Sequence, residues 1–353
     1  MNPERILRRT LAMLLAVLLC SLFGAAAAEP MTFANLREAK TYIKHNQPTE
    51  LTIASGKFRP SELIQIRNDL PEGAEFHFNA TWGNIPYSDE TVDLDLRELK
   101  GAVNVSDLEA LIALCPGLKH IDNTGKRAPS NKEMIPLMEK YPDITFDWIV
   151  NFGHGHVCAT NATTFTTLLP PGSDRKLTSK NMELLKYTPH LKALDLGHND
   201  LKTLDFLQYV PELELLIIAQ NDVKDITPIG QLKHLKYAEL FTNDIESIEP
   251  LANCTELIDL NISFCRPIKD LAALDNLPNL ERLWINMMGR AIPEEEANRF
   301  AEAHPNCYVS YKPSLSPTDN GWRKHIRYKH YIWCFKHHEW VPFDQDIPGV
   351  TYP

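Results

Sequence analysis

The chain has 353 residues, of which 44% are hydrophobic and 23% are charged, and its formal net charge is −10 at pH 7. This length has room for two or three globular domains, and the composition is that of an ordinary soluble protein. The acidic balance argues against nucleic acid as the principal partner, because phosphate contacts need clustered Lys and Arg side chains.

The first 28 residues carry the pattern of a secretory signal. Arg5, Arg8 and Arg9 precede an apolar run over residues 11–23, and small residues follow at 25–28. The apolar run is shorter than the ~20 residues that a membrane-spanning helix needs, and the basic start and small end are typical of a cleaved signal. We therefore expect residues 1–28 to be removed. The rest of the chain would be secreted or held at the cell surface, without stable insertion in a membrane.

Residues 29–150 alternate between short helices and short strands. Their apolar patterns predict helices at 33–43, 61–66, 107–114 and 134–141, and strands at 51–53, 76–78, 92–96, 118–121 and 144–148. We interpret this half as degenerate, longer repeats with helices on the convex side, continuous with the array that follows. The alternative is a separate α/β domain with an open sheet, since either arrangement buries a parallel sheet beneath helices.

Residues 151–176 are rich in Thr, Gly and Pro, and this composition predicts an irregular insertion. The segment brings together three potential metal ligands, His154, His156 and Cys158. No distant partner has the spacing that would complete a tetrahedral zinc site, so we expect a polar strand edge here and no metal.

Residues 177–311 contain an apolar pattern that returns at regular intervals. Its copies begin at Leu191, Leu213, Leu235, Leu257 and Leu280, with a period of 22 residues and one residue inserted in the fourth copy. A single copy cannot bury enough apolar surface to offset the cost of ordering its own backbone, so the copies have to stack.

Each copy is expected to supply one strand to a parallel sheet. At residues 194–196 leucines alternate with a polar residue, which places the leucines on one face of the strand. Five positions after the first of these leucines stand Asn199, Asn221 and Asn243 in three copies, and Cys265 in the fourth. Asparagine can donate to and accept from the backbone groups left open where the chain turns away from its strand.

The spacing L-x-x-L-x-L-x-x-N/C-x-L resembles the leucine-rich repeat signature in its short, internalin-like form. The runs 160–165 and 321–328 further resemble exported leucine-rich repeat proteins of anaerobic Gram-positive bacteria. The resemblance implies an α/β solenoid, a horseshoe with a parallel concave β-sheet. It also implies secretion and binding, but that family has no settled activity to carry over.

The array is expected to end in a terminal cap, made of a helix at 294–303 and a strand at 307–311. Residues 312–353 form a tail in which basic and aromatic residues are mixed, among them Arg323, Lys324, Arg327, Lys329, Lys336, Trp322, Tyr328, Tyr331, Trp333, Phe335 and Trp340. We expect this tail to dock on the acidic solenoid as a second cap. The alternative is contact with an anionic wall polymer or a membrane surface.

No motif in the sequence supports catalysis. There is no G-x-S-x-G, no H-E-x-x-H and no phosphate-cradling glycine loop. Histidines gather in the tail, but their spacing matches no recognised zinc finger. Among the cysteines, Cys307 and Cys334 are the disulfide candidates, whereas Cys254 and Cys265 fall at interior repeat positions and are expected to be buried thiols. We expect no catalytic residues, no metal and no cofactor.

The strand positions that face away from the leucines predict the binding face. We expect a ligand to contact these side chains on the concave face: Asp195, Leu215, Ile217, Tyr237, Glu239, Phe241, Asp259, Arg282 and Trp284. Aromatic and arginine anchors are what protein interfaces favour. The competing possibility is that the tail or the segment at 151–175 folds over these side chains.

The sequence thus predicts a non-catalytic, secreted or cell-surface binding module that holds a protein or peptide on its concave face. Trp284→Ala and Tyr237→Ala are expected to weaken capture of the ligand and to leave thermal unfolding nearly unchanged. The alternatives are a structural spacer or surface-layer component without a specific ligand, and a module that binds wall polymer or glycan through its aromatic tail.

Overall fold

A computed structural model describes residues 29–168, 176–287, 292–312 and 316–352. The expected signal at 1–28 lies outside these described residues. The chain divides into two compact units, one made of residues up to 129 with 136–146, the other of residues 130–135 with 147–353. None of the helices in the described ranges is long and apolar enough to cross a membrane.

The first unit alternates strands and helices, as the sequence predicts. Its elements are β1 (Met31–Thr32), α2 (Leu36–Asn46), β2 (Glu50–Ser55), α3 (Pro60–Asp69), β3 (Glu75–Trp82), β4 (Ile85–Ser88), β5 (Asp93–Asp95), α4 (Val105–Leu114) and β6 (His120–Asn123). Neighbouring strands are parallel in β1–β2–β3 and in β5–β6. Both the degenerate-repeat and the open-sheet interpretations fit this alternation, so the choice between them remains a prediction.

Strands β1 and β4 are elements of the first unit that the sequence analysis missed, and β4 is the longer of the two. Strand β4 pairs with β3 in an antiparallel hairpin, and Gly83 takes a positive φ of 62° at the turn. Glycine adopts that conformation without steric cost, so the Gly83–Asn84 pair was a readable hairpin signal.

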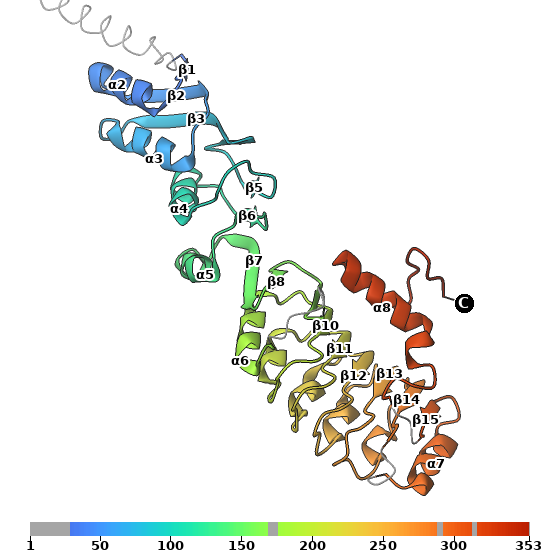
Figure 1. Cartoon of the computed structure of the whole chain (residues 1–353). Coiled ribbons are helices and arrows are strands. Elements are labelled where there is room, and N and C mark those ends of the chain that lie inside the picture. Colours follow the sequence, from blue (N-terminus) through green and yellow to red (C-terminus); the bar gives the residue numbers. More distant parts are fainter. Residues whose placement is uncertain (1–28, 169–175, 288–291, 313–315, 353) are drawn as a thin grey trace, which may run out of the picture. The chain divides into compact units, whose positions relative to one another are not determined.

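The second unit contains a sheet of seven parallel strands in the order β15-β14-β13-β12-β11-β10-β9 (Figure 1). The strands are β9 (Thr164–Thr166), β10 (Ala193–Asp195), β11 (Leu215–Ile217), β12 (Tyr237–Glu239), β13 (Asp259–Asn261), β14 (Arg282–Trp284) and β15 (Tyr308–Ser310). Positions 22 residues apart pair directly, as in Ala193 with Leu215 and Leu215 with Tyr237. The predicted 22-residue period is therefore the spacing of paired positions from β10 to β13, and the inserted residue makes the spacing 23 between β13 and β14.

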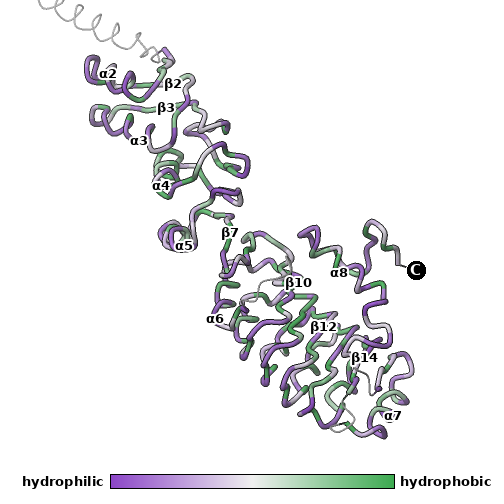
Figure 2. The backbone as a smooth tube through the Cα atoms, in the orientation of Figure 1, coloured by the Kyte–Doolittle hydropathy of each residue, from purple (hydrophilic) through white to green (hydrophobic). Residues whose placement is uncertain are grey.

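The chain returns between these strands through short helical turns. They are α6 (Ser179–Met182), η1 (Glu183–Tyr187), η2 (Asp205–Tyr209), η3 (Thr227–Gln231), η4 (Glu249–Asn253) and η5 (Ala272–Leu274), the last five being 3-10 helices. A repeat of 22 residues leaves room for only one such turn, and 3-10 helices suit short pieces. Figure 2 shows hydrophobic stretches recurring from repeat to repeat between hydrophilic turns.

The asparagines hold the turns of the solenoid together. Asn221 accepts a hydrogen bond from the backbone N–H of Leu201 at 2.9 Å and donates to the carbonyls of Leu196 at 3.0 Å and Ile218 at 2.9 Å. Asn243 repeats this arrangement one turn later, and the Cys265 thiol donates to the Leu240 carbonyl at 3.4 Å. The predicted role of this repeat position is confirmed.

The segment at 151–176 is more regular than expected. It includes the end of β7 (Thr145–Gly153), the hairpin partner β8 (His156–Ala159), and β9, which pairs with β10 so that Phe165 lies opposite Leu194. Threonine is a strand-forming residue, so its abundance did not indicate loop structure alone. The repeat array therefore begins at β9 rather than at residue 177. Residues 169–175, which fall in this segment, lie outside the described residues.

The other elements are α5 (Asn131–Lys140), α7 (Glu294–Ala303), η6 (Trp322–Lys324) and α8 (Ile326–His337). Strand β15 is the last strand at this edge of the sheet, and helix α7 precedes it along the chain, where the sequence analysis expects a terminal cap. Helix α8 does not cover an end of the solenoid. It lies over the open face of the seven-stranded sheet, in red in Figure 1.

Candidate functional site

The nine predicted binding residues lie in, or directly after, five consecutive strands. The register aligns Leu215, Tyr237, Asp259 and Arg282 in one row across β11 to β14. A second row contains Asp195, Ile217, Glu239 and Trp284. Phe241 follows β12. The alternation of the strands thus brings all nine to the face opposite the leucines, as the sequence pattern indicated.

This face is not open to solvent, which corrects the expectation that the nine side chains are free to meet a partner. Their exposed fractions run from 0% for Asp259 to 6% for Arg282. The C-terminal segment, residues 316–352, covers them. It contributes Trp322, Tyr331, Phe335, Trp340 and Phe343 to one buried cluster with the apolar residues of the strands. An exposed row of large apolar side chains on the sheet would be unfavourable in water, and the tail removes it.

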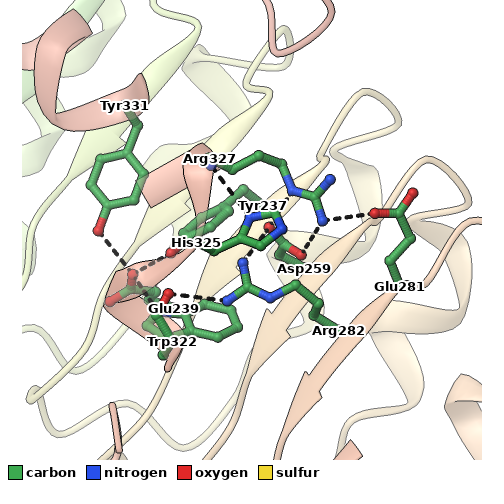
Figure 3. A network of polar contacts seen from close by, with 9 residues as sticks. All are labelled: Tyr237, Glu239, Asp259, Glu281, Arg282, Trp322, His325, Arg327 and Tyr331. Atoms are coloured by element: carbon green, nitrogen blue, oxygen red, sulfur yellow. Dashed lines mark hydrogen bonds and ion pairs between the residues drawn. The ribbon is translucent and has the colours of Figure 1, made fainter. Parts of the chain in front are cut away.

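Glu239 is the centre of one polar contact between the sheet and the C-terminal segment (Figure 3). Its Oε1 accepts hydrogen bonds from the Tyr237 hydroxyl at 2.6 Å, from Trp322 Nε1 at 2.8 Å and from the Tyr331 hydroxyl at 3.0 Å. A buried carboxylate is tolerable only when it is hydrogen-bonded in this way. Burial, followed by the charge of Glu239, raises the pKa of Tyr237 well above its usual range.

Asp259 is the centre of a second contact. Arg327 of α8 donates to both of its oxygens, from Nε at 2.7 Å and from Nη2 at 2.8 Å. Two parallel bonds of this kind are stronger and more specific than a single ion pair. Arg327 also pairs with Glu281 at 2.8 Å (Figure 3). Although burial opposes the charge of Arg327, its bonds to Asp259 raise its pKa above the ordinary arginine value.

Arg282 joins the two contacts. It donates from Nη2 to the Trp322 carbonyl at 3.1 Å, and its Nη1 lies 3.5 Å from Asp259 Oδ2. Its guanidinium carbon is 5.0 Å from the centroid of Trp284 and 4.5 Å from that of Trp322, within the range of cation–π attraction. Burial lowers the pKa of Arg282.

Asp195 differs from Glu239 and Asp259 because its hydrogen-bond donors come from the repeat array and not from the C-terminal segment. It accepts a hydrogen bond from the Gly197 N–H at 3.0 Å and a longer one from the Thr166 hydroxyl at 3.3 Å. Burial is the main reason that its pKa is raised to about 7, and the nearby charge of Glu239 adds to the effect.

Further hydrogen bonds fasten the C-terminal segment at both ends of the sheet. Trp284 Nε1 donates to the Asp319 carbonyl at 2.8 Å near β14, and the Trp340 backbone N–H donates to the Thr163 hydroxyl at 2.9 Å beside β9. The sequence analysis held coverage of the concave face by the tail as the competing possibility and did not name which tail residues would make the contacts. The readable signal was complementarity, because a basic aromatic tail matches a face that carries acidic and aromatic side chains.

The two carboxylates that face the C-terminal segment are already engaged by hydrogen-bond donors. Glu239 and Asp259 are each occupied by donors, and no cluster of three possible metal ligands occurs in the described ranges. The six described cysteines are free and buried, so the candidate pair Cys307 and Cys334 is not a disulfide. Burial raises the pKa of Cys158 and of Cys265 to about 12, which makes these thiols poor nucleophiles.

Three features define a leucine-rich repeat solenoid: the 22-residue register, the parallel sheet, and the hydrogen bonds that Asn199, Asn221 and Asn243 make at the same repeat position, here called the asparagine ladder. No family model matches the sequence, and no curated protein matches it. Among solved structures, an internalin from Listeria monocytogenes is similar at 15% identity and a TM-score of 0.35, over 81% of this chain and 86% of the internalin.

Two other structures show the same kind of likeness. Internalin C2 of Listeria monocytogenes has 17% identity and a TM-score of 0.31, over 62% of this chain and 80% of its own. A leucine-rich repeat protein of Leptospira interrogans has 16% identity and a TM-score of 0.32, over 74% of this chain and 71% of its own. Such distant likenesses carry no assignment of a ligand, so function has to be argued from the site itself.

Proposed function

We propose that this chain is a non-catalytic binding module, exported or displayed at the cell surface, whose concave face recognises a protein or peptide. The C-terminal segment acts as the resident ligand of that face. A partner would displace it and would need similar chemistry, namely a short helix with aromatic side chains and an arginine. The observation that carries the proposal is the pair of buried carboxylates, Glu239 and Asp259, whose donors come largely from the C-terminal segment.

The two carboxylates give the face a preference beyond hydrophobic burial. An apolar helix without donors would leave Glu239 with only the Tyr237 hydroxyl and Asp259 with only the longer contact to Arg282. Loss of the partners of a buried charge is strongly destabilising, by roughly 3–5 kcal/mol when none remains. An aromatic segment that carries an arginine avoids that cost. The face is therefore selective for the class of segment that now occupies it.

The test uses the full chain with the polar anchors of the tail weakened and its aromatic volume kept, as in the double variant Arg327→Ala with Tyr331→Phe. The probe is a labelled peptide with the sequence of residues 321–343, followed by fluorescence anisotropy. The unmodified chain should capture it at least ten times more weakly, because the tethered tail competes at an effective concentration on the order of millimolar.

A matched peptide with Arg327→Glu provides the control, and it should lose at least tenfold in affinity for the double variant. The rival interpretation is a structural spacer without a ligand, which the complete burial of the face favours. A double variant that stays folded by circular dichroism yet captures neither peptide would support the spacer and overturn the proposal.

A further inference from the structure

Beyond the covered face, an open pocket of about 540 Å³ lies at the edge of the sheet beside β14 and β15. It is open while the tail is docked, and since Lys324 and His325 belong to the tail, it is a site of the docked state. Its walls include Glu281, Trp284, Asn306, Tyr308, Lys324 and His325. These come from the last two strands, the turn before β15 and the start of the C-terminal helical segment.

One wall of the pocket is an exposed aromatic ring. Tyr308 is 53% exposed, which is high for a large apolar side chain, and its centroid lies 5.1 Å from that of the buried Trp284. The contact with Trp284 holds the Tyr308 ring in place, and the outer face of the ring stays free. One exposed aromatic face can stack against the C–H groups on one side of a sugar ring.

The other wall supplies hydrogen-bond donors and positive charge. Within the described chain, no ion pair engages Lys324 and no side-chain hydrogen bond engages Asn306. His325 Nδ1 accepts from the Arg327 N–H at 3.3 Å, so the ring proton is on Nε2, which is a donor. The acidic Glu281 is already paired with Arg327 at 2.8 Å, and residues 321–338 contain no Asp or Glu.

We propose that this pocket binds a sugar acid, with the pyranose ring on Tyr308 and the carboxylate beside Lys324. The donors of Asn306 and His325 would meet the hydroxyl groups. An aromatic acid shares the charge and can also stack on Tyr308, but it gains most when both of its ring faces are buried, and this pocket is open with apolar and polar side chains in its lining. The open shape and the mixed lining thus favour the sugar.

The test titrates the full chain with D-glucuronate, D-glucose and benzoate, using ligand-observed NMR. Glucuronate should bind saturably, and glucose should bind at least tenfold more weakly because it lacks the charge. Lys324→Met and Tyr308→Ala should each weaken glucuronate binding at least tenfold. Both side chains are exposed, so both variants should fold.

Lys329→Met is the matched control, since Lys329 is an exposed lysine of α8 that does not line the pocket. It removes the same charge and should leave glucuronate binding unchanged. The proposal is overturned if glucuronate does not saturate, if Lys324→Met has no effect, if Lys329→Met weakens binding equally, or if benzoate binds more tightly than glucuronate. None of these outcomes bears on the capture of peptide by the concave face.

Discussion

At the scale of single residues, burial changes what the aromatic side chains of the concave face do. Trp284 is 3% exposed and touches Trp322 with ring centroids 5.0 Å apart, and Tyr237 is fully buried. Both side chains therefore contribute to the core between sheet and tail. The expectation that their removal would spare thermal unfolding does not hold for this arrangement.

Trp284→Ala should accordingly lower the free energy of unfolding by about 3–5 kcal/mol, the usual cost of removing a large buried aromatic side chain. Chemical denaturation monitored by circular dichroism measures the change. Trp333→Ala is the matched control, because Trp333 is only partly buried at the border of the cluster and should cost clearly less. Equal losses for the two variants would contradict the burial argument.

Asp195 should make stability fall as the pH rises. Its pKa is raised to about 7 in the folded chain, so the folded state holds a proton that the unfolded state releases near its ordinary value of 3.8. The stabilising effect is complete below 3.8 and is lost as the pH rises through about 7. Asp195→Asn should therefore unfold at a higher temperature than the unmodified chain at pH 7.5 but not at pH 4.

Thermal melts at several pH values test this prediction. A difference in unfolding temperature between the two proteins that stays constant with pH would be inconsistent with it.

His325, which both proteins contain, makes stability change with pH in the opposite direction. Burial, with Arg282 and Arg327 nearby, lowers its pKa to about 4, so its contribution is present above its ordinary value of 6.5 and is lost as the pH falls through about 4. Because both proteins contain His325, its contribution to stability cancels when Asp195→Asn is compared with the unmodified chain.

The asparagine ladder gives a third residue-scale prediction. Asn221→Ala removes an acceptor from Leu201 N–H and donors to two carbonyls, all of them buried, and should cost about 1–3 kcal/mol for each group left unpaired. Gln231→Ala, at an exposed position on the opposite side of a repeat, should have almost no effect. Denaturant midpoints give the measurement, and an Asn221→Ala midpoint like that of Gln231→Ala would refute the ladder's role.

At the scale of elements, a buried ion pair adds to the apolar cluster and the Tyr331 hydrogen bond in holding helix α8 on the sheet. Arg327→Ala would leave the fully buried Asp259 without its bidentate partner, at a cost of roughly 3–5 kcal/mol. Hydrogen exchange should then accelerate in α8, while the amides of β11 and β12 keep most of their protection. Lys336→Ala, which changes an exposed position of the same helix, should leave α8 exchange unaltered. Unaltered exchange in Arg327→Ala as well would show that the pair does not hold the helix.

The sequence was most informative where structure is local or periodic. The helix at 294–303 has the observed bounds of α7, and the leucine interval fixes the register from β10 to β13. Local composition was less informative at β8 and β9, where Gly and Thr resembled loop residues. The docking of α8 was left as one of two possibilities, because it joins residues such as Glu239 and Tyr331, 92 positions apart.

At the scale of the whole molecule, the chain forms two compact units, and the second unit combines a repeat array with a segment that is not a repeat. The array follows from stacking of equal units, each of which contacts its neighbours. The C-terminal segment differs from a repeat because it contacts many repeats at once. By covering Leu215, Ile217 and Phe241, it also explains how these apolar side chains on the sheet are compatible with the ordinary overall polarity of the chain.

The path of the C-terminal segment has a consequence for how the solenoid unfolds. In a plain repeat array, the outermost units can fray while the middle persists, so the array melts in stages. Here the same segment is hydrogen-bonded to Trp284 near one end and to Thr163 near the other. Unfolding of any one repeat would weaken the docking of the C-terminal segment, which contacts the other repeats as well. We therefore expect the repeat array and this segment to unfold in a single cooperative transition.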